Sequence, residues 1–315
     1  MQKSISVDGY ELQIEYDENH LARGAQVLAV TGRGYQCIVP EMAENEIHIA
    51  SIGKKAFLGL KSLREIVLPT SIELMGDYAF ANCSMLQNVA FLKHDAITFG
   101  RNMFKGCDRL ASIALGYEKA DDASALLAVA IRMLNAEFLL HPQEVGTQSW
   151  YENFDRALLR YVNAKEDAPE NVQTVCGEED ISYEPSFMVD GEMPDEMGDG
   201  LLEERMKKCE VVFARLLHPQ FLQPSFQEEL EAYIKGQRFR EGGAAWRYLR
   251  TGDLVSEEKL CALYLQLAEH SPEEMDDLLK SIPQSKPSLR ACVIAHASGA
   301  KEKKPAGSLF SDFML

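Results

Sequence analysis

Cysteine side chains are the first candidates for chemistry in this chain, because a thiolate can act as a nucleophile or a metal ligand. The seven cysteines are Cys37, Cys83, Cys107, Cys176, Cys209, Cys261 and Cys292. No two of them form a C-x-x-C pair, so neither a zinc ribbon nor a disulfide framework is indicated. We therefore expect reduced thiols, most of them buried as small core residues.

Two histidines stand in identical "LLHPQ" segments, at residues 139–143 and 216–220. His141 and His218 could suggest a metal ligand or a general base, but no Asp or Glu stands beside either at metal-ligand spacing. A histidine at a helix C-terminus before proline interacts favourably with the helix dipole. We expect that structural role for both histidines. The repeated segment also predicts that one helix–turn–helix unit occurs twice.

The familiar catalytic and cofactor motifs are absent: there is no G-x-G-x-x-G, P-loop, H-E-x-x-H or G-x-S-x-G. "TGRGYQ" precedes a strand pattern, so it cradles no phosphate, and "DGEMPDEMGDG" fails the spacing of a calcium loop. The sequence predicts no enzyme, no cofactor and no metal site. A catalytic helical domain regulated by the rest of the chain remains an alternative.

The charge of the chain limits its partners. Its formal net charge is −17, and residues 117–315 carry 36 Asp/Glu against 21 Lys/Arg. Phosphate backbones need Lys/Arg neutralisation, so nucleic acid is not an expected partner. No apolar run is long enough to cross a membrane, and the first residues have no signal-peptide h-region. We expect a cytoplasmic protein without membrane insertion.

Residues 52–116 contain three successive copies of one sequence motif. Gly53, Gly76 and Gly100 align, so the period is 23 and then 24 residues. The other aligned sets are Phe57/Phe80/Phe104, Leu60/Cys83/Cys107, Leu63/Leu86/Leu110, Ile66/Val89/Ile113 and Leu68/Phe91/Leu115. A fixed period of this length is typical of a solenoid in which each repeat makes one coil.

Each repeat predicts one short strand. "REIVL", "QNVAF" and "ASIAL" alternate, with one apolar face turned inward, and stacked coils would place these strands in a parallel sheet. The aligned glycine stands where we expect no room for a side chain. The phenylalanine that comes after the glycine should fill the core from the side of the coil that faces this sheet.

These residues resemble the BspA-type leucine-rich repeat. Ile52-Gly53, Ala56-Phe57, Ala79-Phe80-x-x-Cys83 and Ile66-x-Leu68-Pro69 match its pattern, and residues 25–116 are covered. The third copy departs, with Met103 in place of alanine and no proline after Leu115. The resemblance implies a parallel-β solenoid used for protein binding, often on bacterial surfaces. A surface or secreted adhesin of the BspA type is therefore the alternative to a cytoplasmic scaffold.

The flanks complete an α+β fold: a short parallel-β solenoid with an N-terminal β cap, followed by an all-α helical-hairpin domain. Asp8-Gly9 is a type I′ turn signal in a hairpin that caps the first coil, within a solenoid domain of residues 1–116. In residues 117–315, "DDASALLAVAIRML" should cover the last coil, and Ser271 and Glu274 form a capping box. Residues 166–204 carry 14 acidic residues without Lys or Arg, which predicts a mobile insertion.

Two segments are candidate protein-binding sites for a partner of unknown identity. The outward strand positions of the repeats form a largely uncharged surface on the side expected to be concave. These positions are Glu65, Val67, Asn88, Ala90, Ser112 and Ala114. The C-terminal tail, 300–315, runs from a basic tether into "LFSDFML", with Leu309, Phe310, Phe313 and Met314. That tail is either a linear motif for a partner or a segment that docks on its own chain.

Overall fold

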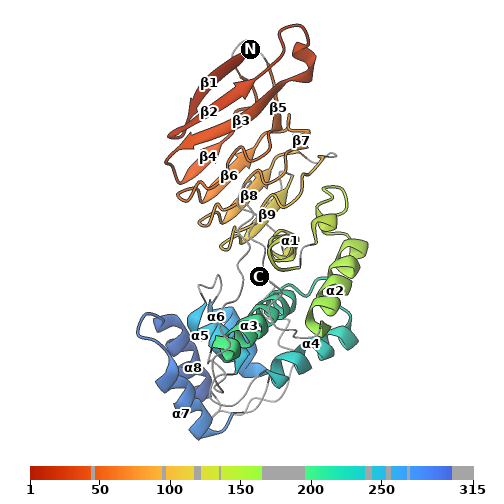
Figure 1. Cartoon of the computed structure of the whole chain (residues 1–315). Coiled ribbons are helices and arrows are strands. Elements are labelled where there is room, and N and C mark those ends of the chain that lie inside the picture. Colours follow the sequence, from red (N-terminus) through yellow and green to blue (C-terminus); the bar gives the residue numbers. More distant parts are fainter. Residues whose placement is uncertain are drawn as a thin grey trace, which may run out of the picture. The chain divides into compact units, whose positions relative to one another are not determined.

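The computed structural model describes residues 1–43, 47–93, 97–116, 122–134, 136–164, 196–237, 243–252, 257–267 and 270–299. The chain forms two compact units (Figure 1). The first comprises residues 1–165 and 214–224, and the second comprises residues 166–213 and 225–315.

A hairpin opens the first unit. Strands β1 (Gln2–Val7) and β2 (Tyr10–Glu15) pair antiparallel, with Val7 opposite Tyr10. Asp8 and Gly9 between them both have positive φ, 51° and 84°, as a type I′ turn requires. The hairpin expected from the Asp-Gly signal is confirmed.

Two sheets form the walls of a parallel-β solenoid. The first has the order β1-β2-β3-β5-β7, with β3 (Ala25–Gly32) antiparallel to β2 and parallel to β5 (Ile49–Ile52), and it ends at β7 (Leu74–Met75). The second has the order β4-β6-β8-β9 and is parallel throughout. Its strands are β4 (Gln36–Ile38), β6 (Glu65–Leu68), β8 (Asn88–Phe91) and β9 (Ser112–Leu115).

A ladder of phenylalanines fills the core between the sheets. The ring centroids of Phe57 and Phe80 lie 5.0 Å apart, and those of Phe80 and Phe104 lie 5.5 Å apart with nearly parallel planes. All three side chains are buried. The shared register of the three repeats therefore predicts the packing correctly, because equivalent residues of stacked coils meet one another.

The aligned glycines mark the closest approach of successive coils. A Cβ on Gly76 would lie 2.4 Å from the Lys54 nitrogen and 2.5 Å from the Gly53 carbonyl carbon. A Cβ on Gly100 would lie 2.5 Å from the Asp77 nitrogen. These neighbours are backbone atoms of the previous coil, so the glycines serve close stacking, as the sequence indicated.

Replacing Gly76 with alanine should destabilise the solenoid by about 1–3 kcal/mol, because the coils must separate to admit the methyl group. Chemical denaturation of the first unit would measure the loss. Gly200→Ala, measured by denaturation of the second unit in which it lies, is the control for an unhindered methyl group, since Gly200 is helical and has nothing within 4 Å of its would-be Cβ. That control should be neutral or slightly stabilising, and an equally neutral Gly76→Ala would contradict the stacking argument.

Helices complete the first unit. Helix α1 (Asp122–Met133) packs beside β9, which confirms that it covers the last coil, and Leu126 and Leu127 are fully buried. A 3₁₀ turn, η3 (Glu137–Leu139), leads to α2 (Gln148–Asn163). The contacts thus group residues up to 165 with the solenoid, whereas the repeat pattern placed a boundary at residue 116.

The second unit is helical in its described residues. Helix α3 (Glu196–Leu217) contributes its last turn to the first unit, and the others are α4 (Pro224–Gly236), α5 (Ala244–Thr251), α6 (Glu257–Gln266), α7 (Pro272–Ser281) and α8 (Pro287–Gly299). The capping box of Ser271 and Glu274 at the start of α7 is confirmed. No helix in the described part of the chain is long and apolar enough to cross a bilayer.

The structure describes only a small part of the expected mobile insertion, 166–204, and none of the C-terminal tail, 300–315. Residues 165–195 and 300–315 lie outside the described residues, and so do Leu309, Phe310, Phe313 and Met314. Residues 196–204 differ from the expected insertion, because they form the first turns of α3. Their helix continues directly into the buried segment around Cys209.

Candidate functional site

The outward side chains of the β4-β6-β8-β9 sheet form two straight rows, which we call the β4–β9 face. Strand register aligns the first row as Gln36, Glu65, Asn88 and Ser112, and the second row as Ile38, Val67, Ala90 and Ala114. The residues between the rows point inward and are buried, as for Ile66 and Val89. Period-two alternation thus gives each strand one core face and one accessible face.

The first row is a polar ladder rich in hydrogen-bond acceptors. Gln36 Nε2 donates to Glu65 Oε2, and Asn88 Nδ2 donates to Glu65 Oε1, each at 3.3 Å. All three side chains are exposed. Each amide donates one of its two N–H groups to the carboxylate, so the oxygen acceptor sites of two amides and one carboxylate outnumber the donors that the row has left for a partner.

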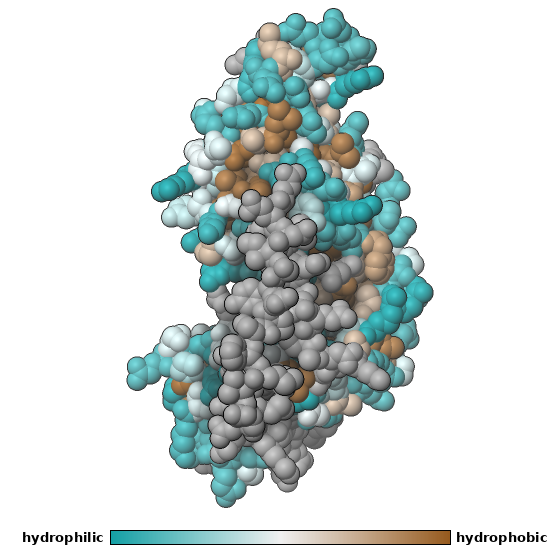
Figure 2. Space-filling model, in the orientation of Figure 1, coloured by the Kyte–Doolittle hydropathy of each residue, from teal (hydrophilic) through white to brown (hydrophobic). Residues whose placement is uncertain are grey.

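The second row is apolar, and an exposed aromatic residue lies on the far side of the first row. Ile38 is 47% exposed, and Val67, Ala90 and Ala114 are partly exposed. Beside β4, Tyr35 is 70% exposed, and the Arg64 guanidinium lies 4.9 Å from its ring centroid. Figure 2 shows apolar surface over the region of β4 and β6.

The structure brings together the six strand residues that the sequence singled out. Their register is as expected: Glu65 pairs with Asn88 and Asn88 with Ser112, and Val67, Ala90 and Ala114 pair likewise. Sequence reasoning missed Gln36 and Ile38, because β4 precedes β6 by 29 residues rather than 23 or 24. The alternation in "YQCIV" was the available signal.

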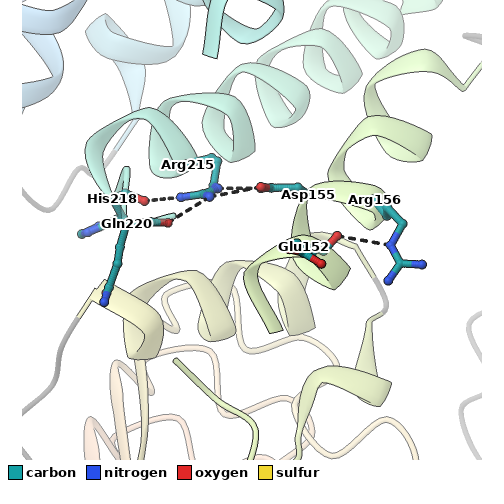
Figure 3. Close-up of polar contacts among 6 residues, drawn as sticks. All are labelled: Glu152, Asp155, Arg156, Arg215, His218 and Gln220. Carbon is teal, nitrogen blue, oxygen red and sulfur yellow. Dashed lines mark hydrogen bonds and ion pairs between the residues drawn. The ribbon is translucent and has the colours of Figure 1, made fainter. Parts of the chain in front are cut away.

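A second cluster of polar side chains surrounds a buried arginine in the same unit. Arg215, in the last turn of α3, is fully buried and meets Asp155 of α2 through two bonds, Nε to Oδ1 at 2.6 Å and Nη2 to Oδ2 at 3.1 Å (Figure 3). It also donates to the carbonyl oxygens of His218 and Gln220. Its guanidinium lies 5.1 Å from the Tyr151 ring centroid.

This arginine cluster is structural in its geometry. The bonds to Asp155 join the end of α3 to α2, and the bonds to the two carbonyl oxygens hold the segment after α3. Tyr151 of α2 adds a 2.9 Å bond from its hydroxyl to Gln220 Oε1. Burial raises the pKa of the Asp155 carboxyl, although the hydrogen bond and charge of Arg215 oppose that rise. The enclosed ion pair therefore fixes the local fold rather than presenting a charge to a ligand.

The two "LLHPQ" segments differ in structure. The first comes after the 3₁₀ turn η3, and His141 is exposed, whereas the second comes after helix α3. Both copies lie between two helices, α1 and α2 for the first and α3 and α4 for the second, but only the second directly continues its preceding helix. The ring of His218 lies 2.7 Å from Asp122 Oδ1 at the start of α1, so it bridges two helices rather than serving only its own.

The solenoid cysteines are hydrogen-bond donors to the previous coil. Cys83 Sγ lies 3.0 Å from the Phe57 carbonyl oxygen, and Cys107 Sγ lies 3.1 Å from the Phe80 carbonyl oxygen. Burial raises the pKa of Cys83 to about 11 and that of Cys37 to about 12. These thiols stay protonated at neutral pH, as expected of core residues rather than nucleophiles.

The described residues offer little that is typical of an enzyme. No group of three or more His, Cys, Asp or Glu among them could hold a metal ion. A surface hollow of about 670 Å³ beside β2 is lined by Glu15, Asp17 and Glu18, among others. The backbone N–H of Asn19 donates to the Asp17 carboxylate and lowers the pKa of Asp17. That carboxyl is therefore suited to staying ionised rather than to donating a proton.

The stacked coils define a leucine-rich-repeat solenoid, with helices after it. Residues 35–122 match the family described as "BspA type Leucine rich repeat region (6 copies)", so this part of the chain is a BspA-type repeat region. The match begins at β4, the strand that the sequence reasoning did not align. A search of curated proteins gave no match.

Several solved structures are similar over about a third of the chain. A leucine-rich repeat protein of Treponema pallidum shows 24% identity over 33% of this chain and 47% of its own, with a TM-score of 0.31. A leucine-rich cell surface protein of Faecalibacterium prausnitzii shows 20% identity over 35% of this chain and 30% of its own, with a TM-score of 0.29. A leucine-rich repeat protein of Bacteroides capillosus shows 19% identity over 35% of this chain and 96% of its own, with a TM-score of 0.25.

Proposed function

We propose that this chain is a protein-binding scaffold that holds its partner on the β4–β9 face of the solenoid. The observation that carries the proposal is the pair of in-register rows, one apolar and one polar, on accessible strands. An apolar strip beside fixed hydrogen-bonding groups is the composition of a protein interface, where apolar contact gives affinity and polar groups give register.

The chemistry of the face favours a partner segment that carries donors. The carboxylate of Glu65 and the amide oxygens of Gln36 and Asn88 accept hydrogen bonds, so lysine, arginine or amide N–H groups of a partner complement them. The net charge of −17 would attract a basic segment over a longer range and speed its association. Small side chains at Ala90 and Ala114 leave room for apolar groups of that partner.

Arginine at Ala90 or Ala114 should abolish partner binding without unfolding the protein. Both side chains point outward, so each new guanidinium can reach water in the free protein but would occupy the space left for apolar groups of the partner. The measurement is quantitative mass spectrometry of proteins retained from a lysate of the native host. We expect at least about a tenfold loss of the specific partner.

Ala232→Arg is the matched control, because Ala232 is an exposed alanine on α4 of the second unit. It should retain the partner, and circular dichroism should show equal melting temperatures for all variants. If the face variants and the control retain the same proteins in the same amounts, the β4–β9 face is not the binding site.

We further propose that the protein acts in the cytoplasm, the environment in which reduced cysteines such as Cys37, Cys83 and Cys107 persist. Fractionation of the native host, with immunodetection of the chain, distinguishes this from an exported adhesin.

A further inference from the structure

Helices α6 and α8 of the second unit bring two cysteines together. Cys261 of α6 is fully buried, whereas Cys292 of α8 is partly exposed. Burial raises the pKa of the Cys261 thiol, and Cys292 raises it further through its side chain and its charge, so the two residues are neighbours. The sulfur of Cys292 also lies 3.8 Å from the carbonyl oxygen of Glu258, which is three residues before Cys261 in α6. The Cys292 side chain therefore lies against the turn of α6 that leads to Cys261, where α6 and α8 pack together.

We propose that Cys261 and Cys292 form a reversible intramolecular disulfide, which fastens α6 to α8 when the protein meets a peroxide oxidant. The exposure of the two residues assigns their order of reaction. Cys292 is reachable from solvent and is oxidised first, and Cys261 is its neighbour and resolves the product. No partner chain or bound cofactor is needed.

The electrons and atoms balance in two steps. The Cys292 thiolate attacks one peroxide oxygen, so an S–O bond forms, the O–O bond breaks, and the departing hydroxide takes up a proton to become water. Cys261 then attacks the sulfenic sulfur, so the S–S bond forms, the S–O bond breaks, and the Cys261 proton leaves with the second water. Two thiols lose two electrons, and one peroxide is reduced to two waters.

The surroundings of Cys261 fit the second role and not the first. Burial raises the pKa of its thiol, and the neighbouring Cys292 adds to that rise. An enclosed thiol is a poor first target for peroxide, but it can attack a neighbouring sulfenic sulfur if its proton passes to the departing hydroxide in the same step. The solenoid pair Cys83 and Cys107 differs, because both thiols are fully enclosed and donate to backbone carbonyls.

The two helices are already fixed at one end, so little movement is needed for the bond. Lys286, next to the start of α8, lies 2.5 Å from Glu257 Oε1 at the start of α6. The same ammonium group donates to the carbonyl oxygens of Leu249 and Gly252. A Cys261–Cys292 bond would add a covalent tie farther along the same helix pair.

The test treats the full chain with graded hydrogen peroxide, blocks the remaining thiols by alkylation and maps peptides by mass spectrometry without reduction. We expect a cross-linked Cys261–Cys292 peptide pair in a monomer whose mass has fallen by two hydrogen atoms, and reversal by dithiothreitol. The cross-link should raise the melting temperature of the second unit by about 5 °C or more, because it restricts the unfolded chain.

Three variants separate the roles. Cys292→Ser should abolish the cross-link, and Cys261→Ala should leave a sulfenic acid at Cys292 that dimedone traps. Cys209→Ser is the matched control, since Cys209 is a buried cysteine of α3, and it should retain the cross-link.

Three results would overturn the proposal. Peroxide could carry Cys292 to the sulfinic acid with no cross-link, or it could join Cys292 to a second chain. It could also leave both thiols reduced under conditions that oxidise them in urea.

Discussion

Replacing Phe80 with alanine is expected to lower the free energy of unfolding of the first unit by about 3–5 kcal/mol. Phe80 is the middle ring of the ladder, fully buried and in contact with both Phe57 and Phe104. Its loss would remove apolar burial and two ring contacts, and it would leave a cavity between two close-packed coils. The backbone of the coils is held by the glycine contacts, so the cavity cannot easily collapse.

Trp150 can report this loss. It lies in the first unit, and the other of the two tryptophans, Trp246, lies in the second, so a Trp246→Phe background isolates the signal during urea unfolding. Phe138→Ala is the control, because Phe138 is 52% exposed in the same unit, and it should cost less than about 1 kcal/mol. Equal losses for the two variants would show that the ladder does not stabilise the core.

Replacing Asp155 with alanine should cost a similar amount, about 3–5 kcal/mol, because it leaves the buried Arg215 without its counter-charge. The energy comes from the uncompensated charge rather than from the strength of the pair. A double variant, Asp155→Leu with Arg215→Met, should therefore recover most of the loss, since it removes both charges together.

Arg156→Ala is the neighbouring control for this ion pair. Arg156 is exposed in α2, and its side chain bonds to nearby groups of the same helix, Asn153 and the Glu152 carbonyl oxygen, the second of which Figure 3 shows. Its removal should change the free energy of unfolding by less than about 0.5 kcal/mol. If Asp155→Ala were as mild as Arg156→Ala, the arginine would have found solvent or another partner. Urea unfolding with Trp150 emission measures the two single variants and the double variant.

The solenoid could be predicted because its information is local and repeated. Equivalent residues such as Phe57, Phe80 and Phe104 must meet when similar coils stack, so periodicity in sequence becomes proximity in space. The Asp8-Gly9 turn and the Ser271 capping box were predictable for the same reason, since each is decided within a few residues.

The outward rows of the β4–β9 face were predictable only in part. The repeats set the register of Glu65 with Asn88, but β4 joins the sheet before a connection of irregular length, so Gln36 and Ile38 had no aligned counterpart. The donation of Gln36 to Glu65 depends on that pairing and became visible only in the folded sheet.

The sequence by itself determined the repeating coil, its core residues and the helical character of the chain after the repeats, because each depends on periodic or neighbouring residues. The tertiary structure alone decided which distant side chains meet. Arg215 finds Asp155 sixty residues away, and Cys261 meets Cys292 across α6 and α8. The helices do not repeat along the sequence, so no period predicts which helices are neighbours. Their contacts depend on how apolar faces pack in three dimensions, and that packing carries no signature in local spacing.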